Sequence, residues 1–298
     1  MRIAQILNRP EYFFRPWQVF KRLTYRRNSI VSVGLPNGLP ITVDTGEDIG
    51  RSIVTQGTYD LIVSEAIARL LEPGELAIDV GANIGYMTAI MAHRVGVEGG
   101  VVAFEPHPAI HTILVGNVTR WRTVAPITLA NCAVSKHAGR MSLHIPKGSD
   151  RNSGLASLNE IEGEIHTVQT VALDDYFDAT TSIALLKIDV EGHELAVLEG
   201  GQRLLRSMLV RDVIFEDHGE YPGAASCLLG THGFEVFRLS RSFSKPVLLA
   251  PCDVRTPRTN VPLNYLATRD PERAQQLFRK RGWRSLRTVA PVESFRFH

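Results

Sequence analysis

Residues 77–87 are the part of this sequence best suited to hold a ligand. A short apolar run ends in Asp79, and two glycines, Gly81 and Gly85, follow before an amphipathic segment begins. Such a turn lets the backbone approach a nucleotide-like molecule without interference from a Cβ atom. Glu105 ends the next apolar run, roughly 20 residues further on, where an acid can bind ribose hydroxyls in a doubly wound sheet. The pattern therefore predicts a ribose-bearing cofactor.

The spacing of the glycines disfavours a dinucleotide. A pyrophosphate-binding turn usually carries three glycines in the pattern G-x-G-x-x-G. This turn has only Gly81 and Gly85, with three residues between them and with Asp79 just before them. A carboxylate there is unfavourable beside pyrophosphate but attracts an ammonium or a sulfonium group, and S-adenosylmethionine carries both. The alternative is an ordinary strand, turn and helix without a ligand, with Asn83 as a helix cap.

A second group of acids follows another buried strand. The apolar run 183–188 leads directly into Asp189 and Glu191. Ligands of open α/β sheets bind at the carboxyl ends of the strands, so we expect Asp189 and Asp79 to face one pocket. Glu194, slightly further on, is also explained by the preference of acids for the first turn of a helix.

A third charged group, residues 216–218, follows a further apolar run. His218 is a candidate general base because an imidazole titrates near neutral pH, and an ordinary surface histidine is the alternative. Asp189, Glu191 and His193 could join this histidine in a metal site. Because neither an H-x-x-x-H nor an H-E-x-x-H spacing occurs among these four residues, we expect no metal.

Alternating strands and helices must position these residues. From residue 75 onward the pattern predicts an α/β fold, with a mostly parallel sheet covered by helices on both faces. A hairpin is expected around 36–38 and a helix over 60–71. Segment 140–175 breaks the alternation and is interpreted as a β insertion or an active-site flap. The predicted strands are 75–80, 100–104, 127–131, 183–188, 211–216 and 234–239, and the main predicted helices are 84–95, 107–118, 191–206 and 221–232.

We expect three parts in the chain: an N-terminal helical and hairpin arm over 1–60, a Rossmann-like domain over 61–250 and an extension over 251–298. The pattern of residues 17–27 predicts an amphipathic helix, interpreted as a packing arm with a solvated basic face. A dimer contact and a dock for an acidic or lipid-linked acceptor are the alternatives. Residues 270–287 are predicted to form a basic helix.

Composition limits the function classes. The chain has 298 residues, of which 44% are hydrophobic, so a sizeable core is expected. Its net charge of +2 is too small to indicate a nucleic-acid or membrane partner. We expect neither a membrane span nor a secretory leader. The three widely separated cysteines, Cys132, Cys227 and Cys252, suggest neither disulfides nor a CxxC metal site, which fits a reducing cytoplasm.

These pieces together resemble the FkbM-type S-adenosylmethionine-dependent methyltransferases. The resemblance extends over about residues 44–240. Its specific part is the block that begins at Lys187 and ends at Gly192, whereas the glycine turn alone fits many Rossmann-like methyltransferases. The matching segments are 78–85, 104–106, 131–135, 186–194 and 197–200, with 48–60 upstream.

The resemblance implies a class I methyltransferase fold and O-methylation of a hydroxyl on a sugar, a polyketide, a similar small molecule or a glycan. It implies that Glu105 binds the ribose hydroxyls, and that Asp189 and Glu191 line the pocket where methyl group and acceptor meet. Residues 153–157 look like the variable flap of the family. The resemblance places Asp79, Gly81, Asn83 and Gly85 around the amino-acid part of the cofactor, and Asn131, Cys132 and Ala133 near the adenine.

Methyl transfer to a weakly acidic hydroxyl benefits from a general base. Our hypothesis from the sequence is that Asp189 or His218 accepts the proton of the acceptor, while Glu191 orients the acceptor. A nicotinamide-dependent oxidoreductase is one alternative, which the missing third glycine and Asp79 disfavour. A non-catalytic scaffold that binds the cofactor is the other, which the pocket acids disfavour. A homodimer is left open.

Overall fold

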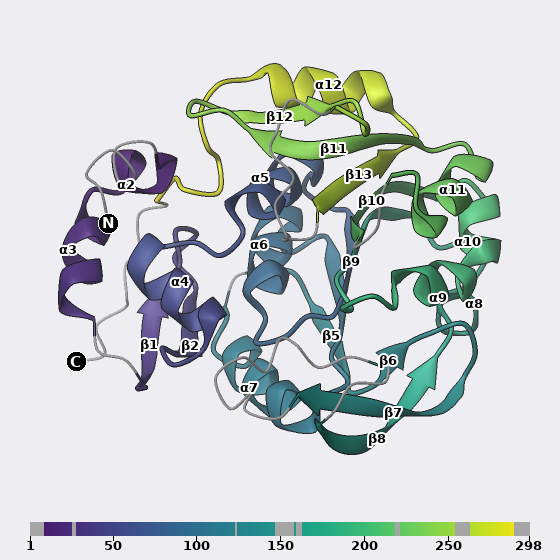
Figure 1. Ribbon diagram of the computed structural model, residues 1–298, viewed down its shortest axis with the longest axis horizontal. Coiled ribbons are helices and arrows are strands. Elements are labelled where there is room, and N and C mark those ends of the chain that lie inside the picture. The colour runs from purple at the N-terminus through teal and green to yellow at the C-terminus, as the bar shows by residue number, and fades with distance from the viewer. Residues whose placement is uncertain are drawn as a thin grey trace.

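A mixed sheet of eight strands forms the centre of the molecule (Figure 1). In spatial order its strands are β12 (Pro246–Leu249), β11 (Glu235–Arg241), β13 (Leu263–Thr268), β10 (Val210–Asp217), β9 (Ile183–Ile188), β3 (Leu76–Val80), β4 (Gly100–Phe104) and β5 (Ile127–Ala130). Neighbours from β5 to β10 pair in parallel, whereas β13 and β12 are antiparallel to their neighbours. All six predicted strands are present, and the mostly parallel α/β fold is confirmed.

The computed structural model describes residues 9–25, 28–122, 124–146, 158, 163–217, 221–253 and 263–288.

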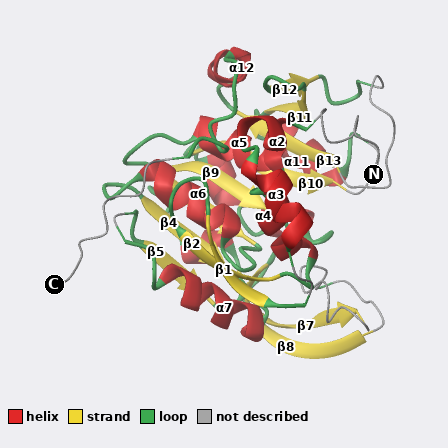
Figure 2. Cartoon of the chain, turned by 90° about the vertical axis from the view of Figure 1, so that its left-hand side faces the viewer, coloured by secondary structure: helices red, strands yellow, loops and turns green. Residues whose placement is uncertain are grey.

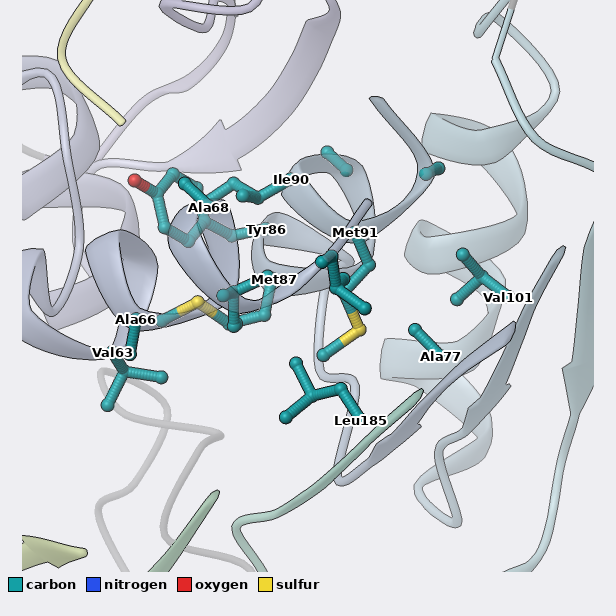
Figure 3. Packing of buried hydrophobic residues seen from close by; sticks show 14 of the residues in the cluster. Val63, Ala66, Ala68, Ala77, Tyr86, Met87, Ile90, Met91, Val101 and Leu185 are labelled. Carbon is teal, nitrogen blue, oxygen red and sulfur yellow. The ribbon is translucent and has the colours of Figure 1, made fainter. Parts of the chain in front are cut away.

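Helices cover both faces of the sheet. One face carries α5 (Leu61–Leu70), α6 (Tyr86–Val95), α7 (Pro108–Val118) and α12 (Pro271–Arg279), and the other carries α8 (Leu173–Tyr176), α9 (Glu194–Glu199), α10 (Gln202–Arg206) and α11 (Ala224–Thr231). Successive strand side chains point to opposite faces. Ala77 and Leu185 therefore pack near Met91 of α6 (Figure 3), while Ile78 and Leu186 belong to the opposite cluster.

Two predicted helices are shorter than expected. The helix expected over 191–206 is divided into α9 and α10, because the chain passes very close to a neighbouring segment at Gly200. A Cβ atom on Gly200 would lie 2.1 Å from the carbonyl oxygen of Ser135. The helix expected over 270–287 ends at Arg279, and Gly282, with a φ of +92°, lies in a backbone conformation that a helix does not use.

Two small β units flank the sheet. The expected hairpin is confirmed as β1 (Ile30–Gly34) and β2 (Pro40–Asp44), and Asn117 of α7 holds it by accepting a 2.7 Å hydrogen bond from the Thr42 amide. The expected β insertion is a sheet of β6 (Ala133–Val134), β8 (Gly163–Val171) and β7 (Gly139–Pro146). The predicted flap residues 153–157 lie outside the described residues.

The C-terminal segment is tied into the main sheet. Strand β13 belongs to the expected extension, yet it pairs between β10 and β11. The buried Arg69 guanidinium of α5 pairs with Glu65 and donates to the carbonyls of Lys280 and Gly282, while Glu65 accepts from the amide of Ser285. The three-part division of the chain stays a prediction, and these contacts join its last part to the second.

The N-terminal arm differs from its interpretation as a packing arm. Helix α3 (Trp17–Thr24) rests against α4 (Asp48–Gln56), and α2 (Pro10–Phe14) packs against α3, as Figure 2 shows. In α3 the buried residue is Gln18, while Trp17, Phe20 and Leu23 are exposed. The contacts with α4 are mostly polar, so the aromatic side of the arm faces outward. None of the helices in the described ranges combines the length and the apolar character that crossing a bilayer requires.

Candidate active site

A cavity of about 290 Å³ opens where β3, β4 and β9 end. The sequence predicted that Asp79 and Asp189 face one pocket, but only Asp189 of these two lines the cavity, together with Glu105. The other lining residues come from the start of α4, the glycine turn, the β insertion and the turn after β9. Of the predicted site residues, Gly81, Asn83, Glu105, Cys132, Ala133, Asp189 and Glu191 line the cavity.

The glycine turn brings two strand ends into close contact. Gly81 has a φ of +77°, and a Cβ atom there would lie 1.9 Å from the carbonyl oxygen of Asp189. Any larger residue would therefore separate β3 from β9 at the rim of the cavity. Asn83 also adopts a positive φ, of +49°, and its backbone N–H donates to the Glu105 carboxylate. The turn thus presents backbone, rather than side chains, to a ligand.

Glu105 is held rigidly at the wall of the cavity. Its Oε2 accepts a 2.9 Å hydrogen bond from the amide of Asn83, and its Oε1 accepts one of the same length from the amide of His107. Burial raises the pKa of Glu105 to about 7, although both hydrogen bonds act in the opposite direction. Each oxygen keeps a second lone pair. The carboxylate is therefore suited to accept hydrogen bonds from a pair of ribose hydroxyls.

Lys187 joins the two predicted acids beneath the cavity. Its Nζ lies 3.1 Å from Oδ1 of Asp79 and 3.4 Å from Oδ2 of Asp189, and it donates to the carbonyl of Gly81 at 3.0 Å. Burial lowers the pKa of Lys187, but attraction by the two carboxylates outweighs burial, so the pKa is raised overall. Asp79 is fully buried, and its Oδ2 accepts a 2.6 Å hydrogen bond from the Thr88 hydroxyl.

Several acids gather on the side of the cavity near α5. Glu191 lines the cavity in a left-handed turn, with a φ of +51°. Burial, assisted by the charges of Asp189 and Glu194, raises the pKa of Glu191 to about 7. Burial also raises the pKa of Glu216 to about 8, with Asp189 and Glu191 adding to the shift. Asp60 lies half-buried nearby, and desolvation raises its pKa as well.

Three predicted cofactor contacts do not line the cavity. Asp79 is turned toward Lys187, below the cavity floor. Gly85 begins α6 and packs against α7, where a Cβ atom would lie 2.7 Å from Leu114. Asn131 donates to the carbonyl of Glu105 at 2.8 Å and thereby holds the loop after β4. These residues support the site instead of facing a ligand. His218 lies outside the described residues.

Sequence reasoning missed two functional side chains. Tyr59 lines the cavity just before α5, with its ring 6.3 Å from that of Tyr86. The only signal was its place in the upstream segment that resembles the family. Lys187 carried a stronger signal, because it is a single charge in the otherwise apolar strand β9, and a buried charge requires a partner.

The charge of the cavity suits a positively charged ligand. Its lining includes the carboxylates of Asp48, Glu105, Asp189 and Glu191. Lys187, the lining residue with a positive charge, is already paired with Asp79 and Asp189. A sulfonium and an ammonium group are therefore both favoured here. Within the described ranges, no three His, Cys, Asp or Glu side chains converge as ligands for a metal ion.

Several known proteins are similar to this chain in sequence. The family model of the methyltransferase FkbM domain matches residues 79–236. A 31-O-demethyl-FK506 methyltransferase, FkbM of Streptomyces tacrolimicus, is 32% identical over 244 residues, which cover 70% of this chain and 90% of that protein. A hexuronic acid methyltransferase, AglP of Haloferax volcanii, is 30% identical over 207 residues, which cover 68% of this chain and 80% of that protein.

Solved structures of methyltransferases are also similar to this chain. The S-adenosylmethionine-dependent O-methyltransferase of Thermotoga maritima matches with a TM-score of 0.41 and 16% identity, covering 82% of this chain and 94% of that one. The family match decides against the nicotinamide-dependent alternative. The cofactor is S-adenosylmethionine, as the sequence predicts, and the chain belongs to the family of FkbM methyltransferases.

Proposed function

We propose that this protein transfers the methyl group of S-adenosylmethionine to a hydroxyl oxygen of a small molecule or a glycan. The observation that carries the proposal is the meeting of Glu105, Asp189 and Glu191 around one cavity. The names of the two relatives, which refer to 31-O-demethyl-FK506 and to hexuronic acid, support this class of acceptor. A cytoplasmic location and the exclusion of nucleic acid as a partner stay predictions from composition.

The proposed cofactor contacts follow the lining of the cavity. Glu105 would hold the ribose hydroxyls, and the backbone at Gly81 and Asn83 would lie beside the amino-acid part. Cys132 and Ala133, at the start of the β insertion, would contact the adenine. When bound, the cofactor supplies an electrophilic methyl group on a positively charged sulfur. Asp79 would act through Lys187, because its carboxylate does not reach the cavity.

We propose that Glu191 is the general base that accepts the proton of the acceptor hydroxyl. The sequence favoured Asp189 or His218 for this step, but Asp189 lies beside the Lys187 ammonium at 3.4 Å. Glu191 lines the same cavity, and burial raises its pKa to about 7, which suits a base that works near neutral pH. Asp189 would then orient the acceptor hydroxyl. This exchanges the roles that the sequence hypothesis gave to the two carboxylates.

A methylation assay on a panel of acceptors tests the proposed function. The purified protein is incubated with methyl-labelled S-adenosylmethionine and with hydroxyl-bearing uronic acids, glycans or polyketides. Matched analogues whose hydroxyls are already methylated serve as controls. We expect transfer to some free hydroxyl acceptors and none to the blocked analogues. If S-adenosylhomocysteine binds but no acceptor is methylated, the non-catalytic scaffold is favoured.

The Glu105 carboxyl predicts a pH-dependent affinity for the cofactor product. Ribose hydroxyls donate hydrogen bonds, so they bind the ionised carboxylate, which forms as the pH rises through about 7. The affinity for S-adenosylhomocysteine should therefore rise by about tenfold between pH 6 and pH 8, in proportion to the ionised fraction. Isothermal titration calorimetry measures this, and Glu105→Gln should show a flat profile. An unchanged pH dependence in that variant would assign the effect to another group.

A further inference from the structure

An exposed aromatic surface covers the N-terminal arm. Its members, which we call the aromatic patch, are between 43% and 79% exposed. The side chains of α3 in this patch recur three residues apart, so they form one stripe along the helix. Aromatic rings within it also touch, with centroid distances of 5.3 and 5.8 Å. The aromatic patch consists of Phe13, Phe14, Trp17, Phe20 and Leu23.

The opposite side of the arm is fixed to the protein by polar contacts. Gln18 is buried against α4 next to Gly57, and the Arg15 guanidinium donates to the Gly57 carbonyl at 3.2 Å. Arg9 donates to the side chain of Gln56 at 2.9 Å. These contacts determine which side of the arm faces the protein. The aromatic patch consequently points away from it.

A second chain segment extends the patch. Phe243, in the turn between β11 and β12, is partly exposed, and its ring lies 5.5 Å from that of Phe13. Lys245 follows two residues later in the same turn. Two segments that are far apart in the sequence meet here. The surface is therefore held in a fixed shape by tertiary contacts.

The charged residues in the N-terminal part of the sequence are almost all positive. The first 29 residues contain seven of the 33 lysines and arginines but one of the 31 acids, and the rest of the chain carries 26 basic and 30 acidic residues. The single acid, Glu11, is buried and lies 3.8 Å from Arg241. Lys21 is exposed beside the stripe, and Arg22 donates to the Tyr12 hydroxyl at 2.6 Å. The net charge of +2 for the whole chain therefore does not reveal that its N-terminal segment is basic.

We propose that the aromatic patch docks the protein on an anionic lipid bilayer, with α3 lying in the interface. A short helix that combines exposed Trp, Phe and Leu side chains with basic neighbours has the composition of an interfacial anchor. A second copy of the chain fits less well, because self-association through this face would bring two strongly basic segments together. Anionic headgroups neutralise these charges instead, while the aromatic rings enter the acyl boundary.

The position of the patch connects docking to the cavity. The arm rests on α4, and Asp48 and Ile49 at the start of α4 line the cavity. Figure 2 shows α2, α3 and α4 together on the side of the molecule that faces the viewer. A bilayer bound by the patch would therefore be separated only by the arm from the helix that carries part of the cavity wall. The docking itself does not depend on which acceptor is methylated.

Vesicle co-sedimentation of the full chain tests the proposal. We expect binding to phosphatidylglycerol-containing vesicles and much weaker binding to pure phosphatidylcholine. The triple variant Trp17→Ser, Phe20→Ser, Leu23→Ser should lose about 100-fold or more in partition, because three large apolar side chains no longer enter the membrane. Lys21→Ala should lose about fivefold. Trp17 fluorescence should shift to the blue on binding, since Trp121 and Trp283 are buried in the protein.

A matched triple variant controls for apolar surface in general. Val97→Ser, Ile165→Ser and Met208→Ser remove comparably exposed side chains from other parts of the molecule. This control should bind vesicles like the wild type. Affinity for S-adenosylhomocysteine shows whether each variant is folded.

Three results would overturn the proposal. One is equal binding of the folded patch variant and the wild type, and another is no binding of the wild type to anionic vesicles. The third is a dimer in light scattering that the patch variant dissociates, without any vesicle binding, because this would make a second copy the occupant.

Discussion

Replacing Glu191 with glutamine is expected to lower kcat by about 10²–10⁴-fold, the usual contribution of a general base. The side chain keeps its size and still lines the cavity. It can no longer take a proton from the acceptor hydroxyl, however. Because Glu105 and the glycine turn are untouched, the affinity for S-adenosylhomocysteine should stay close to that of the wild type. Kinetics with a free-hydroxyl acceptor to which the wild type transfers the methyl group, and calorimetry of product binding, measure the two effects separately.

The pH profile of the wild type gives a second readout for Glu191. A base must be deprotonated to act, so kcat should rise with pH and level off above about 7, where burial places the pKa of Glu191. This rising limb should disappear in Glu191→Gln. Glu199→Gln, on the partly exposed Glu199 that pairs with Lys136, is the matched control and should behave like the wild type.

Full activity of Glu191→Gln would remove Glu191 from the base role. Asp189→Asn and His218→Ala would then identify the base that the sequence hypothesis named. A large loss in Asp189→Asn, with cofactor binding unchanged, would restore that hypothesis for Asp189. A loss confined to His218→Ala would instead assign the step to the histidine that follows β10.

The sequence predicted the order of strands and helices because hydrophobic periodicity is local. It could not separate Gly81 from Gly85, since both follow one strand and both adopt a positive φ. Their roles depend on contacts distant in the chain: Gly81 meets the backbone of Asp189, whereas Gly85 meets Leu114. Strand β13 was missed for a similar reason, because its partners β10 and β11 precede it in the chain and pair with it from both sides.

The two strand-end acids show how two steps along neighbouring strands change a role. Asp79 is the last residue but one of β3 and pairs in register with Lys187 of β9, whereas Asp189 directly follows β9. Side chains two residues apart in a strand point to the same face, so these two acids differ in their distance from the edge of the sheet and not in the face that they share. Asp189 therefore lines the cavity, and Asp79 reaches it only through Lys187. The pattern located the correct edge of the sheet but not how far each carboxylate lies from the cavity.

Replacing Lys187 with methionine is expected to lower the free energy of unfolding by about 3–5 kcal/mol, as removal of one partner from a buried ion pair usually does. The Asp79 carboxylate is fully buried and would lose the ammonium that lies 3.1 Å away. The Gly81 carbonyl would lose its 3.0 Å donor as well. Chemical denaturation of the wild type and the variant measures this change.

Two further variants separate the ion pair from the loss of a lysine as such. Lys136→Met removes a half-exposed lysine that pairs with Glu199 at 3.3 Å, and surface pairs of this kind contribute about 0–1 kcal/mol. Lys187→Met combined with Asp79→Asn removes the unpaired charge, while the asparagine can still accept from Thr88. This double variant should regain part of the lost stability. The difference between its effect and the sum of the effects of Lys187→Met and Asp79→Asn measures the coupling.

The same contacts of Lys187 should also determine how Lys187→Met changes the affinity of the site for the cofactor product. Without Lys187, neither the Gly81 turn nor the Asp189 carboxylate has its buried anchor, so the affinity for S-adenosylhomocysteine should fall even where the variant is folded. A loss of stability no larger than that of Lys136→Met, together with wild-type affinity, would contradict this role. In that case Asp79 would be stabilised chiefly by Thr88, its 2.6 Å donor. The floor of the cavity would then not depend on a charge shared between β3 and β9.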